Sequence, residues 1–222
     1  YHSGAKCMMA FLGALLASAI VSGRSIVTGL SKTSVILSGV AISSLCASAS
    51  QLILSIRPET VTDKAAFSIG GFASVPLSAV RFAVPVILCC LGVSVSASGC
   101  LDIMLLGDEV AAGLGLHIVF YRTLHMILAS VLAGSAVSMC GLEGFVGLMV
   151  PNFIKLFFHG KARDGMLLCI FVGASLLLLC DTAARLVVFP YEIPCGLILS
   201  VLGTPFLIWI LVKRRKRLVS YD

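Results

Sequence analysis

Residues Ser34–Ile56 read SVILSGVAISSLCASASQLILSI, a stretch that contains no charged side chain. A helix needs about 20 mostly apolar residues to cross the hydrocarbon core of a bilayer, and this stretch is long enough. Because the hydrocarbon supplies no water, the backbone groups must be hydrogen-bonded within the chain, and the strict alternation of a barrel strand is absent. The stretch therefore predicts a transmembrane α-helix.

The whole chain is also rich in apolar residues and poor in charged ones. Hydrophobic residues make up 59% of the 222 residues, charged residues make up only 12%, and the mean hydropathy is +1.10. Soluble domains carry about 25% charged residues, so water is excluded as the main solvent. Further apolar runs lie between short polar clusters, at about 5–21, 75–95, 120–140, 145–158, 166–188 and 193–212. The sequence predicts an all-α membrane protein, a polytopic bundle of about seven transmembrane helices.

The start of the chain and its cysteines add two expectations. The chain begins at Tyr1 without the basic segment and cleavage site of a signal peptide, which we interpret as a truncated N-terminus. The nine cysteines form no C-x-x-C pair and mostly lie in apolar runs. A packing role is therefore favoured over a metal site or a disulfide framework.

The basic run Lys213–Arg217 decides the expected orientation. Lysines and arginines beside a span resist translocation, so the tail at 213–222 is expected in the cytoplasm. When the predicted spans are counted back from this tail, the loops at 24–32, 101–122 and 159–164 also face the cytoplasm. Most basic residues then lie on that side. The net charge of +6 therefore needs no nucleic-acid partner, and anionic lipid stays open as a secondary contact of the tail.

The connection between the runs at 75–95 and 120–140 is longer and more polar than the others. Asp108 is suited to cap a helix N-terminus, Glu109 would lie in the positive first turn, and Gly115 can supply a left-handed stop. These residues predict a short helix that cannot span the bilayer and lies at the cytoplasmic surface. Two interpretations stay open: the helix binds a partner, or it merely joins two spans.

Two further segments carry functional signals. Glycines at 141–147 and Pro151 permit irregular backbone, which membranes tolerate only where it is buried or lines a cavity. Pro151 is expected to interrupt the short span at 145–158. Asp181 and Arg185 are four residues apart, a spacing that allows an ion pair on one helix face. The pair is either structural or lets Arg185 present positive charge to an external acidic partner.

The same sequence argues against two rival classes. A secondary transporter normally needs carboxylates within the membrane for ion coupling, and none lies deep in an apolar run. A hydrolase would need a nucleophile beside a histidine, but His117, His125 and His159 lie near predicted cytoplasmic ends and no G-x-S-x-G motif is present. Because a G-x-x-x-x-G-K-[ST] phosphate loop is also missing, the chain is expected to bind no nucleotide and to carry no catalytic or metal site.

Three segments, in this order and at these separations, resemble signatures of the iron-siderophore, haem and cobalamin permeases of bacterial ABC importers. They are LGDEVA with a following LG at 106–115, GFVGL with VP at 144–151, and DTAAR, EIPCG and LGTPF within 181–206. Residues 37–42 and 70–72 fit as well, so the resemblance covers nearly the whole chain. Such permeases have a ten-helix fold, which implies that about three N-terminal spans are missing from this chain.

The resemblance implies a function for the chain as a whole. Residues 1–222 would form one transmembrane permease domain in the bacterial cytoplasmic membrane, paired with a second copy or a paralogue. ATP would be bound and hydrolysed by a separate ATP-binding subunit docked on a coupling loop at 101–117. An external substrate-binding protein would deliver ferric siderophore, haem or cobalamin. The expected function is ATP-driven import of such a chelate; the alternative is a secondary active transporter of a small solute.

The resemblance also implies roles for single residues. The residues matching the coupling loop are Leu106, Gly107, Asp108, Glu109, Ala112, Leu114 and Gly115. Arg185 matches an external arginine that pairs with the binding protein. The translocation path and its gate match Ser31, Thr33, Ser34, Gly144, Gly147 and Pro151. Asn152 and Lys155 stand where the family commonly has His and Arg, which leaves the identity of the chelate open.

Overall fold

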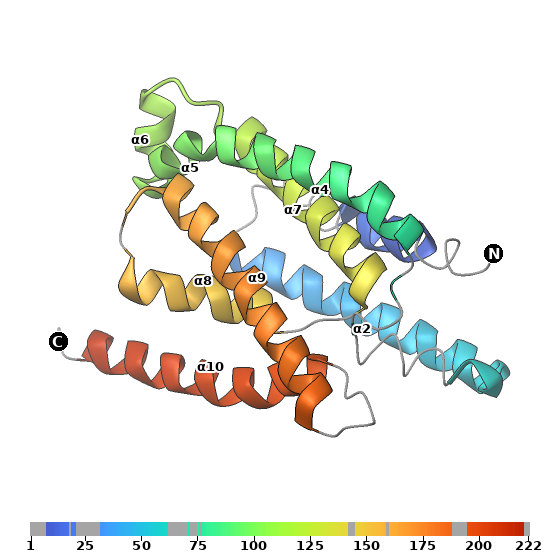
Figure 1. Ribbon diagram of the computed structural model, residues 1–222. Coiled ribbons are helices and arrows are strands. Elements are labelled where there is room, and N and C mark those ends of the chain that lie inside the picture. Colours follow the sequence, from blue (N-terminus) through green and yellow to red (C-terminus); the bar gives the residue numbers. More distant parts are fainter. Residues whose placement is uncertain are drawn as a thin grey trace. The chain divides into compact units, whose positions relative to one another are not determined.

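The structure, a computed structural model, describes residues 8–17, 19–20, 32–61, 71, 75, 77–141, 145–158, 160–187 and 195–219 (Figure 1). The labelled elements in these ranges are α2 Lys32–Ile56, η1 Pro58–Thr60, α4 Leu77–Ser96, α5 Ser98–Leu105, α6 Asp108–Gly113, α7 Ile118–Cys140, α8 Val146–Phe157, α9 Ala162–Val187 and α10 Cys195–Val219. A further helix covers Met8–Ala17. Every regular element of the described residues is helical, so the predicted all-α fold is confirmed.

Three helices in the described ranges are individually long and apolar enough to cross a membrane. They cover Ile36–Ile56 of α2, Ile118–Cys140 of α7 and Ala162–Leu186 of α9. Each begins and ends within a few residues of a run that the hydropathy predicts. A bilayer is the solvent that such helices require, because each carries a long apolar surface with few charged side chains.

Helical structure continues from α4 into the predicted connection at 101–117. Helix α5 already begins at Ser98, and it is bent by 46° from the segment Ala83–Ser96 of α4. At Ala97 the backbone has φ −87° and ψ 3°, and the Ser98 hydroxyl donates a hydrogen bond of 2.7 Å to the carbonyl oxygen of Val95. This bond satisfies a carbonyl at the bend, so the chain turns without leaving helical structure.

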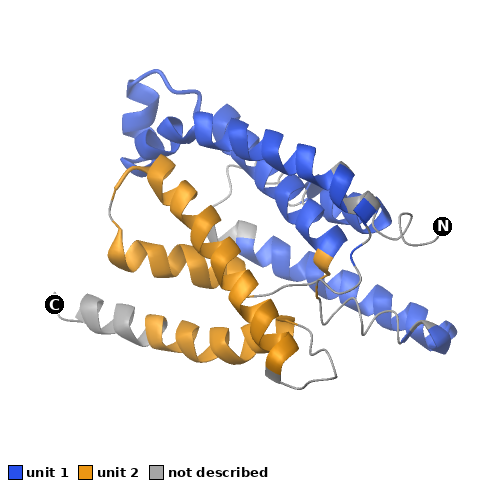
Figure 2. Ribbon diagram, viewed as in Figure 1, with its two compact units in different colours: residues 1–68, 75–139 blue, residues 69–74, 140–222 orange. Residues whose placement is uncertain are grey.

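The chain divides into two compact units, which Figure 2 distinguishes by colour. Unit 1 comprises residues 1–68 and 75–139, and unit 2 comprises residues 69–74 and 140–222. Within unit 1, Gly134 of α7 allows close helix packing. A Cβ atom placed on Gly134 would lie 3.3 Å from side-chain atoms of both Phe11 and Ala14. Small residues at such contacts are how helices associate in lipid, where the hydrophobic effect gives no help.

Helices α8, α9 and α10 pack against one another in unit 2. Their buried apolar side chains are Val150, Ile154, Cys180, Ala184, Cys195, Leu199 and Ile210. Aromatic rings also contact one another at the surface of this unit, since the ring centroids of Phe153 and Phe206 are 5.9 Å apart and those of Phe206 and Trp209 are 6.1 Å apart. Phe153 and Trp209 are 40% and 51% exposed. The short helix α8 is thereby held by packing rather than by its length.

Helix α8 continues through Pro151, so the predicted interruption at this residue is wrong. Proline lacks a backbone N–H and therefore removes one hydrogen bond of the helix. The neighbouring Asn152 side chain donates a 2.7 Å hydrogen bond from Nδ2 to the carbonyl oxygen of Leu148. Packing of Val150 and Ile154 in the core of unit 2 holds the helix on both sides of the proline.

Large apolar side chains are exposed along α2. Ile36, Leu37 and Leu45 are 66%, 68% and 71% exposed, and none of the apolar window of this helix is buried within the structure. Soluble monomers rarely leave so extensive an apolar surface in water. The surface of α2 therefore requires lipid or other transmembrane helices around it.

Candidate functional site

The candidate site comprises the turn after α5, the short helix α6 and the turn that follows it (Figure 1). We call this segment the elbow and define it as residues Leu105–Leu116. Its first bend is made by Gly107, whose φ of 109° and ψ of 153° are accessible to glycine and strained for other residues. The carbonyl oxygen of Gly107 accepts a 3.0 Å hydrogen bond from the Ala111 amide, the first bond of α6. Gly107 is therefore the N-cap residue of α6.

The prediction that Asp108 caps α6 is wrong. Asp108 is the first residue of the helix, and the N-cap position makes no side-chain cap bond. The Asp108 carboxylate instead accepts two hydrogen bonds from Nη2 of Arg122, at 2.9 Å to Oδ1 and 3.1 Å to Oδ2. Because the guanidinium is cationic, these are charge-assisted hydrogen bonds, which are stronger than neutral ones. Glu109 lies in the first turn, as predicted.

The predicted left-handed stop at Gly115 is confirmed. Gly115 has a φ of 81°, and its amide donates to the carbonyl oxygen of Ala112 at 2.9 Å. The amide of Leu116 donates to the carbonyl oxygen of Ala111 at 3.1 Å. These two bonds form the Schellman arrangement, in which a glycine ends the helix and the last carbonyl groups are satisfied.

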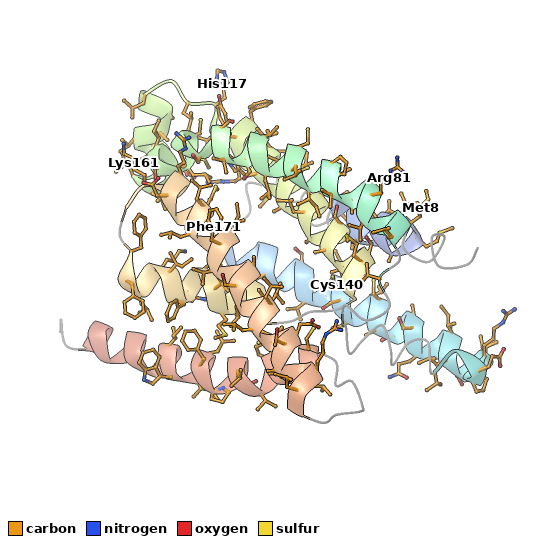
Figure 3. All side chains as sticks on the ribbon, in the orientation of Figure 1. Met8, Arg81, His117, Cys140, Lys161 and Phe171 are labelled. Atoms are coloured by element: carbon orange, nitrogen blue, oxygen red, sulfur yellow. The ribbon has the colours of Figure 1, made fainter. Side chains whose placement is uncertain are left out.

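The elbow presents an apolar surface outward. Leu105, Leu106, Val110 and Leu114 are 82%, 65%, 50% and 65% exposed, and we call these four side chains the elbow patch. Ala111, on the same short helix, is 0% exposed and anchors α6 inward. With six residues, α6 is only about 9 Å long and cannot cross a bilayer. His117 follows the elbow, and its side chain points outward in Figure 3.

The structure brings all predicted residues of the coupling loop into the elbow and leaves each of them exposed. They are Leu106, Gly107, Asp108, Glu109, Ala112, Leu114 and Gly115. Sequence reasoning did not single out Arg122, which ends the predicted cytoplasmic loop at 101–122. Nothing in the local pattern signals a pair between residues separated by 14 positions along the chain.

Beside the elbow, α4, α5 and α7 enclose an open groove of about 610 Å³. Its lining is Leu88, Cys89, Gly92, Val93, Ser96, Ala97, Cys100 and Tyr121. No charged side chain is among these lining residues. Within the described residues, no group of three or more His, Cys, Asp or Glu side chains could hold a metal ion.

The predicted ion pair in unit 2 is confirmed. Nε of Arg185 donates a 2.9 Å hydrogen bond to Oδ2 of Asp181, one turn earlier on α9. The Arg185 side chain remains 50% exposed, whereas that of Asp181 is 26% exposed. The carboxylate therefore orients the guanidinium, and half of the arginine stays accessible from outside the helix.

The predicted path and gate residues are scattered along the described chain. Ser31 and Gly144 lie outside the described residues, and Thr33 and Ser34 lie in the first turn of α2. Gly147 is exposed in the first turn of α8, and Pro151 lies in the middle of that helix. The described members therefore belong to two helices, α2 in unit 1 and α8 in unit 2.

Irregular backbone does occur before α8, in the glycine segment where the sequence predicted it, and it extends to Phe145, which the sequence did not single out. Phe145 has a φ of 66°, although it is not a glycine, and Gly141 has a φ of 78°. A Cβ atom on Gly203 of α10 would lie only 2.8 Å from Cβ of Phe145 and 2.9 Å from its Cγ. The contact explains why position 203 holds a glycine, since packing against α10 holds Phe145 in a strained conformation.

Comparisons with known proteins agree on one family. The profile of the FecCD transport family matches residues 2–213. The chain is 31% identical over 179 residues to the Fe(3+) dicitrate transport system permease protein FecD of Escherichia coli K12, covering 81% of this chain and 56% of that protein. It is 32% identical over 211 residues to the hemin transport system permease protein HmuU of Yersinia pestis, covering 94% of this chain and 63% of that protein.

The chain is also similar to a vitamin B12 import system permease protein, BtuC of Yersinia pseudotuberculosis. The identity is 30% over 212 residues, covering 92% of this chain and 61% of that protein. The chain thus spans between 56% and 63% of the length of these three relatives. Its fold matches a solved metal-chelate type ABC transporter in an inward-facing conformation with a TM-score of 0.77, at 22% identity, covering 91% of this chain and 75% of that one.

Proposed function

This chain belongs to the FecCD transport family, and we propose that it acts as the transmembrane permease subunit of an ATP-driven importer. It would provide the path for the cargo, while a separate ATP-binding subunit hydrolyses ATP. The permease would lie in the bacterial cytoplasmic membrane with its 213–222 tail inside, because the basic run at 213–217 resists translocation. It would work as a pair, with either a second copy or a paralogue.

The elbow is the observation that carries this proposal. A short polar connection of twelve residues has no need of four exposed leucine and valine side chains unless another molecule covers them. Exposed apolar side chains surrounded by polar residues mark interaction sites, and the elbow patch is flanked by the exposed Asp108 and Glu109. The predicted membrane topology is consistent with docking of an ATP-binding subunit, because it puts the elbow on the cytoplasmic side, where ATP is available.

The structure of the elbow suits a lever. Gly107 and the Schellman turn at Gly115 mark the two ends of α6, and buried Ala111 anchors the helix inward. A partner that pushes on the elbow patch would therefore move α6 as a rigid piece rather than unwind it. Tilting of the spans by such levers would open the path alternately to the two sides of the membrane.

The cargo is proposed from the names of the relatives. Those names refer to ferric dicitrate, hemin and vitamin B12, which are all chelates of a metal ion. We therefore assign a metal chelate as the cargo class. The choice among chelates would be made largely by an external binding protein that delivers the cargo.

Arg185 is proposed as a contact for that binding protein. Its guanidinium is oriented by Asp181 and remains half exposed near the predicted outer end of α9. A positive charge in this position would steer an acidic surface toward the permease. The Asp181 carboxylate would keep the arginine extended in one direction before the partner arrives.

The proposal is tested by co-purification of the full-length protein with its ATP-binding subunit in mild detergent. Replacing Val110 and Leu114 together by aspartate should remove the subunit, because both side chains belong to the elbow patch. The control is Leu77→Asp, which alters a leucine that is 83% exposed at the other end of α4, on the predicted outer side. Retention of the subunit by the double variant would contradict docking at the elbow.

A further inference from the structure

We propose that Arg122 is a positioning residue that locks α6 to α7, so that movement of the elbow is transmitted to this span. The inference rests on the proposed function, in which a partner pushes on the elbow. It adds a residue that no part of the family resemblance singled out. The role of Arg122 is to hold the lever and not to touch the partner or the cargo.

The geometry places the lock at the base of the elbow. Asp108 is the first residue of α6, and Arg122 lies in the second turn of α7. One nitrogen, Nη2, is shared between both carboxylate oxygens, at 2.9 Å and 3.1 Å. The pair closes the loop that runs from Asp108 through α6 and the Gly115 turn back to α7. It differs from the Asp181–Arg185 pair, which lies within one helix.

The lock is needed because α6 is joined to its neighbours through glycines. Gly107 precedes the helix and Gly115 follows it, and both have positive φ values. A glycine can rotate more freely than other residues once no side chain restrains the segment. Without the link to Arg122, a push on the elbow patch could turn α6 about these two glycines, and α7 would stay behind.

The exposure of the pair predicts which property changes when it is broken. The side chains of Arg122 and Asp108 are 46% and 60% exposed, and exposed ion pairs contribute little to the stability of a whole protein. Loss of the pair should therefore leave the permease folded. It should change the population of α6 in its wild-type orientation, relative to other orientations, by about two- to fivefold.

The test uses the full-length permease with its ATP-binding subunit and its binding protein in proteoliposomes. Ferric dicitrate, hemin and cyanocobalamin are offered as probes, and uptake per ATP hydrolysed is measured for the probe that the wild type imports. For Arg122→Ala and Asp108→Asn we expect a loss of about two- to fivefold in uptake per ATP. Arg122→Ala, which lies outside the elbow, should retain binding of the ATP-binding subunit. The charge swap, Asp108→Arg with Arg122→Asp, should recover most of this loss. The control Arg81→Ala removes an exposed arginine near the other end of α4 and should change nothing (Figure 3).

Hydrogen exchange of the permease alone gives a second measurement that needs neither ATP nor cargo. The amides of Gly115 and Leu116, which close the end of α6, should exchange about two- to fivefold faster in Arg122→Ala and return toward the wild-type rate in the charge swap. Unchanged coupling and unchanged exchange in Arg122→Ala, or a charge swap no better than the single variants, would overturn the lock. A wild-type permease that binds no ATP-binding subunit would instead overturn the proposed function, whatever the exchange rates are.

Discussion

Replacing Gly107 by alanine should weaken binding of the ATP-binding subunit by disturbing the elbow. Gly107 has a φ of 109° and a ψ of 153°, a conformation essentially restricted to glycine. A Cβ atom at this position would meet no atom within 4 Å, so the substitution creates no clash with neighbouring groups. The penalty is therefore that of the backbone conformation itself, about 1–3 kcal/mol.

This penalty lowers the fraction of permease molecules whose elbow has the conformation that binds the ATP-binding subunit. If α6 keeps its orientation only while Gly107 holds this conformation, 1–3 kcal/mol corresponds to a rise in Kd of about 5- to 140-fold. The assay is titration of the detergent-solubilised, full-length permease with the purified ATP-binding subunit by biolayer interferometry. Thermal unfolding of the same samples shows whether the change stays local.

The matched control is Gly113→Ala in the same helix. Gly113 lies at the end of α6, and a Cβ atom there would also meet no atom within 4 Å. Its φ is not in the left-handed region, so alanine is tolerated and favours the helix by up to about 1 kcal/mol. The Kd of this variant should stay near or below the wild-type value. Equal Kd values for wild type and Gly107→Ala, or equal losses in both variants, would refute the argument.

Three further variants test the remaining contacts. Gly115→Ala places a side chain on a residue with a φ of 81°, which should cost about 1–2 kcal/mol and speed hydrogen exchange at the Leu116 amide; an unchanged rate would contradict the Schellman turn. Gly203→Ala introduces a Cβ atom 2.8 Å from that of Phe145 and should lower the stability of unit 2 by about 1–3 kcal/mol in thermal unfolding, whereas Gly173→Ala on α9, with no atom within 4 Å, should not. Arg185→Ala should weaken association with the external binding protein most at low ionic strength, because screening is weak there; a loss independent of salt would argue against steering by charge.

The helices of this chain could be predicted well because hydropathy determines them. The run predicted at Ser34–Ile56 is helix α2, Lys32–Ile56, and the run predicted at 120–140 is α7, Ile118–Cys140. In a membrane, the length of an apolar stretch follows from the thickness of the hydrocarbon and needs no knowledge of the rest of the fold. The bend at Ala97 escaped prediction because Ser96, Ser98 and Gly99 end the apolar run there without showing that the chain continues as a helix.

The elbow could be predicted in part, for a reason that differs between its residues. Gly115 was identified because a glycine after a short helix has one common use, the left-handed stop. The role of Asp108 was misassigned because its partner, Arg122, is brought near only by the fold. Phe145 could not be identified at all, since a positive φ at a phenylalanine depends on packing against Gly203, far along the chain.

The central claim is that import through this permease is driven by ATP, and proteoliposomes test it most directly. The full-length permease is reconstituted with its ATP-binding subunit inside and the binding protein outside, and the entry of labelled ferric dicitrate, hemin or cyanocobalamin is followed. We predict uptake that requires ATP in the lumen and continues after ionophores have collapsed the proton and sodium gradients. Uptake that proceeds without ATP and stops when an ion gradient is collapsed would contradict the claim and identify a secondary transporter.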